Sequence, residues 1–180
     1  MDAADISEIK EAVGNAKQRS SNLTHLTAAE FELPTLAPRL AQIQTDLEDG
    51  SGICIIRGLP VGDFSADEAE IAFCGIAAHL GTAVPQTADG RRLFHVRDEG
   101  FAPNDPKWRG PSSRKRLSFH SDRCDVIAFL CLQQALRGGD NFVVSAITLY
   151  NELLSTRPDL VEVLMEPFYY QRHNVDPANP

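Results

Sequence analysis

Residues 119–147 read FHSDRCDVIAFLCLQQALRGGDNFVVSAI, and this stretch determines the fold class that we expect. Two short apolar runs, residues 117–120 and 126–132, lie on either side of the His-Ser-Asp triplet. The glycine pair at 138–139 is typical of a turn, and residues 142–147 form another short apolar run. Short runs of this kind, separated by turn residues, predict β-strands in an antiparallel sheet.

Upstream of this stretch, the pattern predicts mainly helices. Apolar residues recur at helical spacing over residues 5–19 and again over about 35–48. Ser65 and Glu68 have the spacing of a capping box, which predicts a helix that begins after Ser65 and stops at Gly81. Two further apolar runs, residues 52–58 and 93–97, have the length and composition of strands.

Downstream, residues 148–165 predict a helix with a break at Thr156-Arg157-Pro158, where proline restarts a helix in its first turn. Helices first and short strands second indicate the α+β class. Residues 98–115 are rich in Pro, Gly, Asn and Arg without periodicity, which is typical of a long functional loop.

The composition excludes several classes of protein. The chain has 180 residues, 43% of them hydrophobic, and a formal net charge of −8. This length suits one globular domain, and the acidic charge argues against nucleic acid or an anionic membrane as a partner. No apolar run is long enough to span a bilayer, and the N-terminal residues lack the apolar core of a secretory signal. We therefore expect a cytoplasmic protein without a membrane partner.

The four cysteines form no CxxC pair, and each has apolar neighbours in the sequence. We expect them to be reduced and buried as small hydrophobic side chains. They are Cys54, Cys74, Cys124 and Cys131.

His120 and Asp122 are the residues that indicate a chemistry. In an extended strand, residues i and i+2 point to the same face, so the imidazole and the carboxylate converge. An imidazole and a carboxylate placed in this way make up two of the three ligands of a 2-His-1-carboxylate triad. Such a triad holds Fe(II) and leaves positions open for a co-substrate and O₂. The alternative is a structural histidine that is held by hydrogen bonds, because His-x-Asp also arises by chance.

The sequence around this motif resembles the TauD/TfdA family of Fe(II)/2-oxoglutarate-dependent dioxygenases. The resemblance runs from about residue 50 to 172, and it includes the His-x-Asp motif, the Gly-Gly turn and the segment VVSAITLYNELLSTRPDL. It implies a double-stranded β-helix (jelly roll) with flanking N-terminal helices. On this basis residues 1–50 are an N-terminal helical region, and residues 51–180 are the first part of the dioxygenase domain, which is incomplete at its C-terminus.

The resemblance also implies the cofactors and their ligands. His120 and Asp122 are the expected iron ligands, with 2-oxoglutarate and O₂ as co-substrates. Asn141 occupies the position where relatives contact 2-oxoglutarate through Thr or Ser. The third ligand and the arginine that pairs with 2-oxoglutarate are expected farther downstream, and His173 does not lie in the family's distal motif.

Three further residues are candidates for the substrate pocket. Gln86 follows the turn after the third predicted helix, and His95 and Arg97 alternate along a predicted strand. For His95 and Arg97 the alternative is one exposed and one hydrogen-bonded side chain at a strand edge. A basic group in the long loop either attracts an anionic ligand or faces water, and Trp108 lies in the same loop. The basic group comprises Arg109, Arg114, Lys115 and Arg116.

We therefore expect an Fe(II)- and 2-oxoglutarate-dependent dioxygenase that acts on a small organic molecule. One alternative is a catalytically inactive relative that serves as a binding or interaction module, because unpaired strands favour association, including a homo-oligomer. A minor alternative is a metal hydrolase built on His120 and Asp122.

Overall fold

The computed structural model describes residues 1–19, 25–86, 90–102, 113–114, 116–122 and 124–169. Its contacts divide the chain into two compact units, Met1–Leu130 and Cys131–Pro180, which we describe separately. The boundary predicted near residue 50, between a helical region and a dioxygenase domain, stays a prediction. Within the described residues, no helix has the length and apolar composition needed to cross a membrane.

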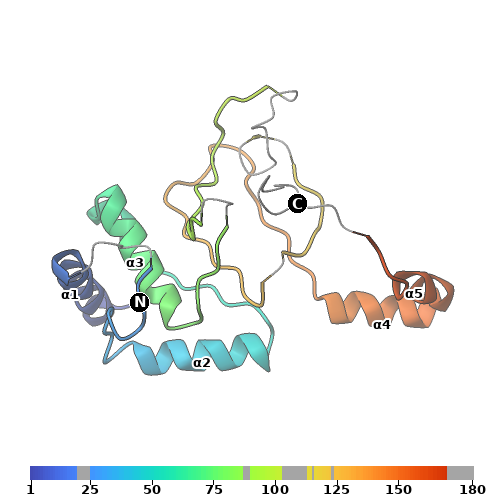
Figure 1. Ribbon diagram of the computed structural model, residues 1–180, viewed down its shortest axis with the longest axis horizontal. Coiled ribbons are helices and arrows are strands. Elements are labelled where there is room, and N and C mark those ends of the chain that lie inside the picture. Colours follow the sequence, from blue (N-terminus) through green and yellow to red (C-terminus); the bar gives the residue numbers. More distant parts are fainter. Residues whose placement is uncertain (20–24, 87–89, 103–112, 115, 123, 170–180) are drawn as a thin grey trace. The chain divides into compact units, whose positions relative to one another are not determined.

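The first unit is built on three α-helices and a short 3₁₀ helix (Figure 1). The α-helices are α1 (Ala3–Arg19), α2 (Ala37–Glu48) and α3 (Ala66–Ala78), and the 3₁₀ helix is η1 (Val61–Asp63). All three predicted N-terminal helices are confirmed. The capping box is confirmed as well, because the Glu68 amide donates to the Ser65 hydroxyl while the Ser65 amide donates to the Glu68 carboxylate.

The core of this unit lies where α1 packs against α3 and the segment before α2 fills the space beside them. Phe31 is fully buried, and its ring lies directly against the backbone of Gly75 on α3. A Cβ atom at position 75 would lie 2.3 Å from Cγ of Phe31, so only glycine fits there without a shift. The other buried members of the core are Ile9, Ala12, Val13, Ala16, Leu33, Leu36, Leu40, Ile71, Ala72 and Ile76.

We predict that Gly75→Ala lowers the free energy of unfolding by about 1–3 kcal/mol, because overpacking forces Phe31 out of its site. Gly14→Ala in α1 is the matched control, since no atom lies within 4 Å of its added Cβ. Alanine also favours a helix over glycine, so this variant should gain up to about 1 kcal/mol. Urea unfolding followed by circular dichroism measures both, and equal effects would contradict the packing argument.

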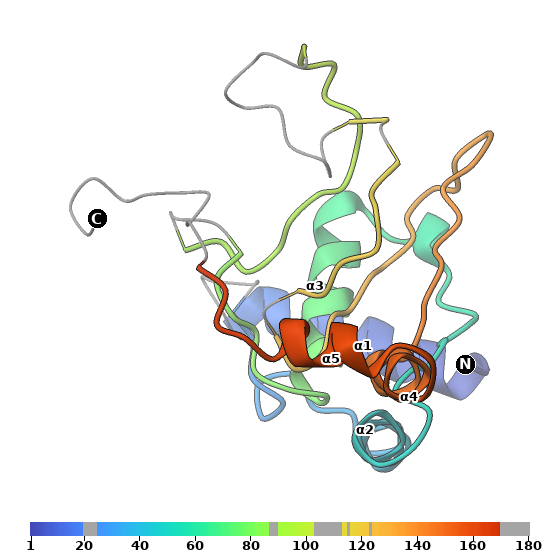
Figure 2. The ribbon, with the colours of Figure 1, turned by 90° about the vertical axis from the view of Figure 1, so that its right-hand side faces the viewer.

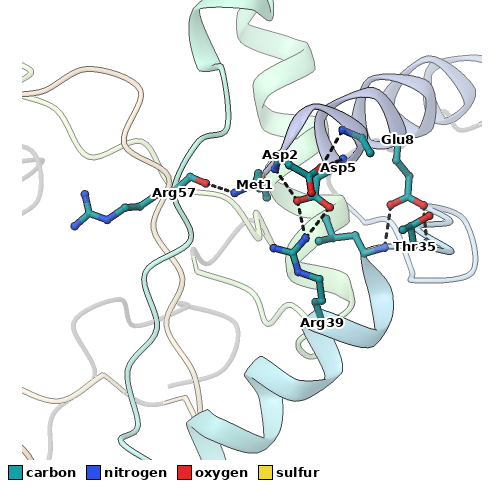
Figure 3. Close-up of polar contacts among 9 residues, drawn as sticks. Met1, Asp2, Asp5, Glu8, Thr35, Arg39 and Arg57 are labelled. Carbon is teal, nitrogen blue, oxygen red and sulfur yellow. Dashed lines mark hydrogen bonds and ion pairs between the residues drawn. The ribbon is translucent and has the colours of Figure 1, made fainter.

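Polar contacts fix α1 to the start of α2 (Figure 3). Asp5 is 2% exposed, and both of its carboxylate oxygens accept hydrogen bonds from Nη1 of Arg39, at 2.8 and 2.7 Å. Glu8 accepts hydrogen bonds from the amides of Thr35 and Leu36, at 2.6 and 3.0 Å. Helix α2 has no side-chain cap of its own, so a carboxylate from α1 neutralises its positive end.

The Asp5 pair should make the first unit sensitive to acid. The hydrogen bond from the Asp2 amide and the contact with Arg39 hold the pKa of Asp5 below its ordinary value, against the opposing effect of burial. The unfolded chain therefore binds this proton more readily than the folded chain. The stabilisation is complete above the ordinary aspartate pKa and is lost as the pH falls through the lowered value.

We predict that Asp5→Asn lowers the melting temperature by several degrees at neutral pH and flattens its decline in acid. Asp63→Asn is the control, because Asp63 forms an exposed ion pair with Lys10 and such pairs stabilise little. Thermal melts across the acid range measure the effect. An Asp5→Asn melting temperature that tracks the parent protein at every pH would contradict the assignment.

The second unit contains α4 (Ala146–Thr156) and α5 (Pro158–Leu164), which pack against each other. Ser145 caps α4 by accepting a hydrogen bond from the Thr148 amide, and the chain breaks at Arg157, as the proline after it predicts. Each helix is seen along its length in one view and end-on in the other, so the two cross steeply (Figures 1 and 2). Of the two helices, only Val161 is buried, so most of their apolar side chains are exposed.

The predicted strands are wrong for this structure. Residues 52–58, 93–97, 117–120, 126–132 and 142–147 form no strand anywhere in the described part of the chain. Their apolar side chains are exposed, for example Phe129 at 71%. The alternation marks side chains that suit a half-buried sheet, but a strand also needs a neighbour for its backbone hydrogen bonds, and no strand pairing is formed within the described residues. The described residues therefore contain no sheet, and the expected α+β jelly roll is not confirmed.

Candidate metal centre and its surroundings

His120 has a geometry that suits metal binding through one particular ring atom. Its side chain is exposed, and Nδ1 lies 2.8 Å from the carbonyl oxygen of Ser118. A carbonyl oxygen only accepts, so Nδ1 carries the proton and donates it. Nε2 is then the ring nitrogen that keeps a lone pair, and a hydrogen bond of this kind at the other nitrogen orients histidines that bind metals.

Asp122 is the second predicted iron ligand. Asp122 is exposed. Burial raises the pKa of the nearby Cys124 thiol, and the charge of Asp122 raises it further. An imidazole nitrogen and a carboxylate oxygen are donors that suit Fe(II). Among the described residues no cluster of three His, Cys, Asp or Glu side chains is assembled, so this donor pair has no third partner there. His173, which the sequence set aside as a ligand, lies outside the described residues.

The three candidate pocket residues are held by contacts of their own. The Gln86 amide donates to the Arg91 carbonyl at 2.6 Å, and its side chain donates to the Val84 carbonyl at 3.3 Å. His95 Nε2 lies 3.1 Å from a carboxylate oxygen of Glu70 on α3. These contacts fix the segment on either side of residues 87–89 and attach it to the helical core. A role for these residues in substrate binding stays a prediction.

Arg97 is paired with Glu99, at 3.5 Å between Nε and a carboxylate oxygen, and its side chain is otherwise exposed. Asp98 accepts from the Gly100 amide and pairs with Arg114 of the basic group. These contacts lower the pKa of Asp98, with the Gly100 amide as the larger cause and Arg114 as the second. Trp108, Arg109 and Lys115 lie outside the described residues.

Asn141 belongs to the second unit. It follows the predicted Gly-Gly turn, which is confirmed, because Gly138 and Gly139 have φ angles of 71° and 79° that other residues rarely adopt. The Asn141 side-chain amide lies 3.4 Å from the Gly139 carbonyl and is exposed. A contact between this amide and 2-oxoglutarate stays a prediction.

Sequence analysis missed Glu70 as the partner of His95 and the Ser118 carbonyl as the group that orients His120. The capping box placed Glu70 on a helix, but the sequence does not say which distant residue meets that helix. The Ser118 contact is local, and its two-residue spacing from His120 is the signal that would have revealed it.

Comparison with known proteins places the chain in a family. The model of the family described as "Taurine catabolism dioxygenase TauD, TfdA family" matches residues 19–179. The chain belongs to this family. The match includes every candidate site residue from Gln86 to Asn141.

Two curated relatives of this TauD/TfdA family chain carry names of enzymes. The chain is 32% identical over 171 residues to the FR-33289 synthase of Streptomyces rubellomurinus. The aligned part covers 94% of the chain and 50% of the relative. It is 31% identical over 174 residues to a taurine hydroxylase-like protein of Stachybotrys chartarum. Here the aligned part covers 93% of the chain and 45% of the relative. The chain thus spans about half the length of the curated relatives it matches.

The cysteines are free, as expected, but most are not buried. Cys54 and Cys131 lie in segments that form no strand and are exposed, Cys124 lies between two such segments and is exposed as well, and Cys74 on α3 is partly buried. Burial and the nearby charge of Glu70 raise the pKa of the Cys74 thiol to about 11.

We predict that Cys74 reacts with iodoacetamide at about pH 8 at least about tenfold more slowly than Cys54 or Cys131, because the thiolate is the reactive form. Mass spectrometry of the labelled peptides against time measures each rate within one sample, so the exposed cysteines serve as internal controls. Labelling of Cys74 at the rate of Cys54 would contradict the burial seen here.

Proposed function

We propose that this chain forms the iron-binding part of an Fe(II)- and 2-oxoglutarate-dependent dioxygenase that oxidises a small organic molecule. The observation that carries the proposal is the His120-Asp122 pair, with Nε2 of His120 left free by the Ser118 carbonyl, in a chain of the TauD/TfdA family. The names of the two relatives, a synthase and a hydroxylase-like protein, support a small-molecule substrate and an oxidation.

The residues of this chain have separate tasks in the proposed reaction. Bound iron supplies the activation of O₂ that is coupled to decarboxylation of 2-oxoglutarate. His120 donates Nε2, and the Ser118 carbonyl keeps the ring in the tautomer that allows this. Asp122 adds a negative charge that partly balances the metal. Asn141 donates a side-chain N–H to 2-oxoglutarate, and Gln86, His95 and Arg97 face the substrate.

We also propose that the family's jelly roll forms when the unpaired segments find neighbours. Two features support this: the segments carry the strand pattern, and the chain spans about half the length of its relatives. Exposed apolar side chains such as Ile55 and Phe129 would then enter the core between two sheets.

The second candidate function is that of a catalytically inactive binding module. It is favoured by one observation, namely that the described residues bring no third metal-binding side chain to His120 and Asp122. In this case the exposed apolar segments are the binding surface, and a homo-oligomer is one way to cover them. A cytoplasmic location is proposed for both functions.

Iron binding separates the two functions. We predict that anaerobic Fe(II) and 2-oxoglutarate together produce a visible charge-transfer band with the parent chain. His120→Ala and Asp122→Ala should each abolish the band and weaken iron binding by more than about 100-fold, which exceeds the usual cost of removing a residue that only hydrogen-bonds to a ligand.

His25→Ala is the matched control, because His25 is an exposed histidine in the same unit that no motif includes. It should keep the band and the iron affinity. Iron retained by both ligand variants would refute the proposed ligands, and a parent chain without band or iron uptake would favour the binding module.

A further inference from the structure

Helices α4 and α5 carry apolar side chains that the described residues leave uncovered. On each helix, three of these side chains recur at helical spacing and form a stripe along one side. The six residues, which we call the α4–α5 stripes, are between 37% and 72% exposed. They are Ile147, Tyr150 and Leu154 on α4, and Leu160, Val163 and Leu164 on α5.

Helices as short as these need to bury an apolar side in order to be stable. Helix α4 has 11 residues and α5 has 7, and isolated helices shorter than about 12–15 residues are marginal in water. Where the two helices pack against each other, Val161 is buried and Leu153 is half-buried. Helix α5 also begins without a side-chain cap. A partner that covers the stripes would therefore stabilise both helices.

The carboxylates of the two helices do not border the stripes with uncompensated charge. By helical periodicity, Glu152 lies on the side of α4 opposite its stripe, and Glu162 lies on the side of α5 opposite its stripe. Asp159 flanks the α5 stripe, but it is paired with Arg157, at 2.7 Å between Nη2 and a carboxylate oxygen. A partner therefore meets an apolar surface without a charged edge.

This pattern favours one kind of partner. A helix that binds an anionic membrane or a nucleic acid carries several Lys or Arg residues, and α4 and α5 contain none. A charged protein partner would find no opposite charge beside the stripes. A second copy of this chain brings stripes of the same size and polarity. It also leaves the helix carboxylates of the two copies apart, although each chain has a net charge of −8.

The exposed area is close to the area that a dimer needs. The stripes expose on the order of 600 Å² per copy, and a stable interface buries about 800 Å² per partner. Leu149 on α4 and Met165 at the end of α5 are also exposed, at 48% and 75%, and add to this area. Two copies of the helix pair can therefore form an interface of ordinary size.

We propose that the α4–α5 stripes are the interface of a homodimer, in which the helix pair of one chain packs against the helix pair of a second copy. The stripes of both copies then share one apolar core. This assignment goes beyond the proposed dioxygenase and does not depend on iron, because His120 and Asp122 lie outside α4 and α5.

Sedimentation velocity of the full chain at several concentrations tests the proposal. The parent chain should show a monomer–dimer equilibrium. Leu154→Asp and Val163→Asp each place a charge in both halves of the interface, so each should raise the dimer dissociation constant at least about tenfold. Leu136→Asp is the matched control, because Leu136 is a 99% exposed residue of the same unit outside both helices. It should keep the dissociation constant of the parent chain.

Hydrogen exchange of the parent chain is a second measurement, which does not depend on how a variant folds. The amides of α4 and α5 should exchange more slowly where the dimer forms and faster on dilution. A parent chain that is monomeric at every concentration, or a dimer that Leu154→Asp and Val163→Asp leave unchanged, would overturn the proposal. Equal protection of α4 and α5 in monomer and dimer would overturn it as well, because another part of the chain would then cover the stripes.

Discussion

The peptide groups of an extended segment need a neighbouring strand, whereas those of a helix are satisfied within the helix. This constraint divides the molecule. Helices α1, α2 and α3 satisfy most of their own backbone groups, so they can assemble a core around Phe31 from nearby parts of the chain. The segments with strand patterns cannot satisfy their backbone hydrogen bonds within themselves. Most of their apolar side chains are exposed, and of the two candidate iron ligands His120 lies on one of these segments and Asp122 follows it.

Local signals predicted the local structure well. The Ser65 capping box, the proline after Arg157 and the Gly138-Gly139 turn each act within a few residues, and each is found where the sequence placed it. The strands were wrong because alternation describes what a segment would bury and does not say whether a partner is present. The predicted burial of Cys54 and Cys131 was wrong for the same reason, since both lie on those segments.

The candidate site likewise combines contacts between sequence neighbours with contacts between residues that are distant in the sequence. His120, Asp122 and the Ser118 carbonyl are neighbours in sequence, so their relation needs only a short piece of backbone. The contact between His95 and Glu70, by contrast, depends on how a segment meets α3, which no local pattern encodes.

The contact between Glu8 and the start of α2 bears on where the folding unit begins. The family match starts at residue 19, so it leaves out nearly all of α1. Yet α1 supplies the acceptor for the Thr35 and Leu36 amides, the buried partner of Arg39, and one wall of the core. A shortened protein trimmed to the family boundary would therefore lose the cap of its next helix. For expression or domain grafting, the first eighteen residues belong to the domain.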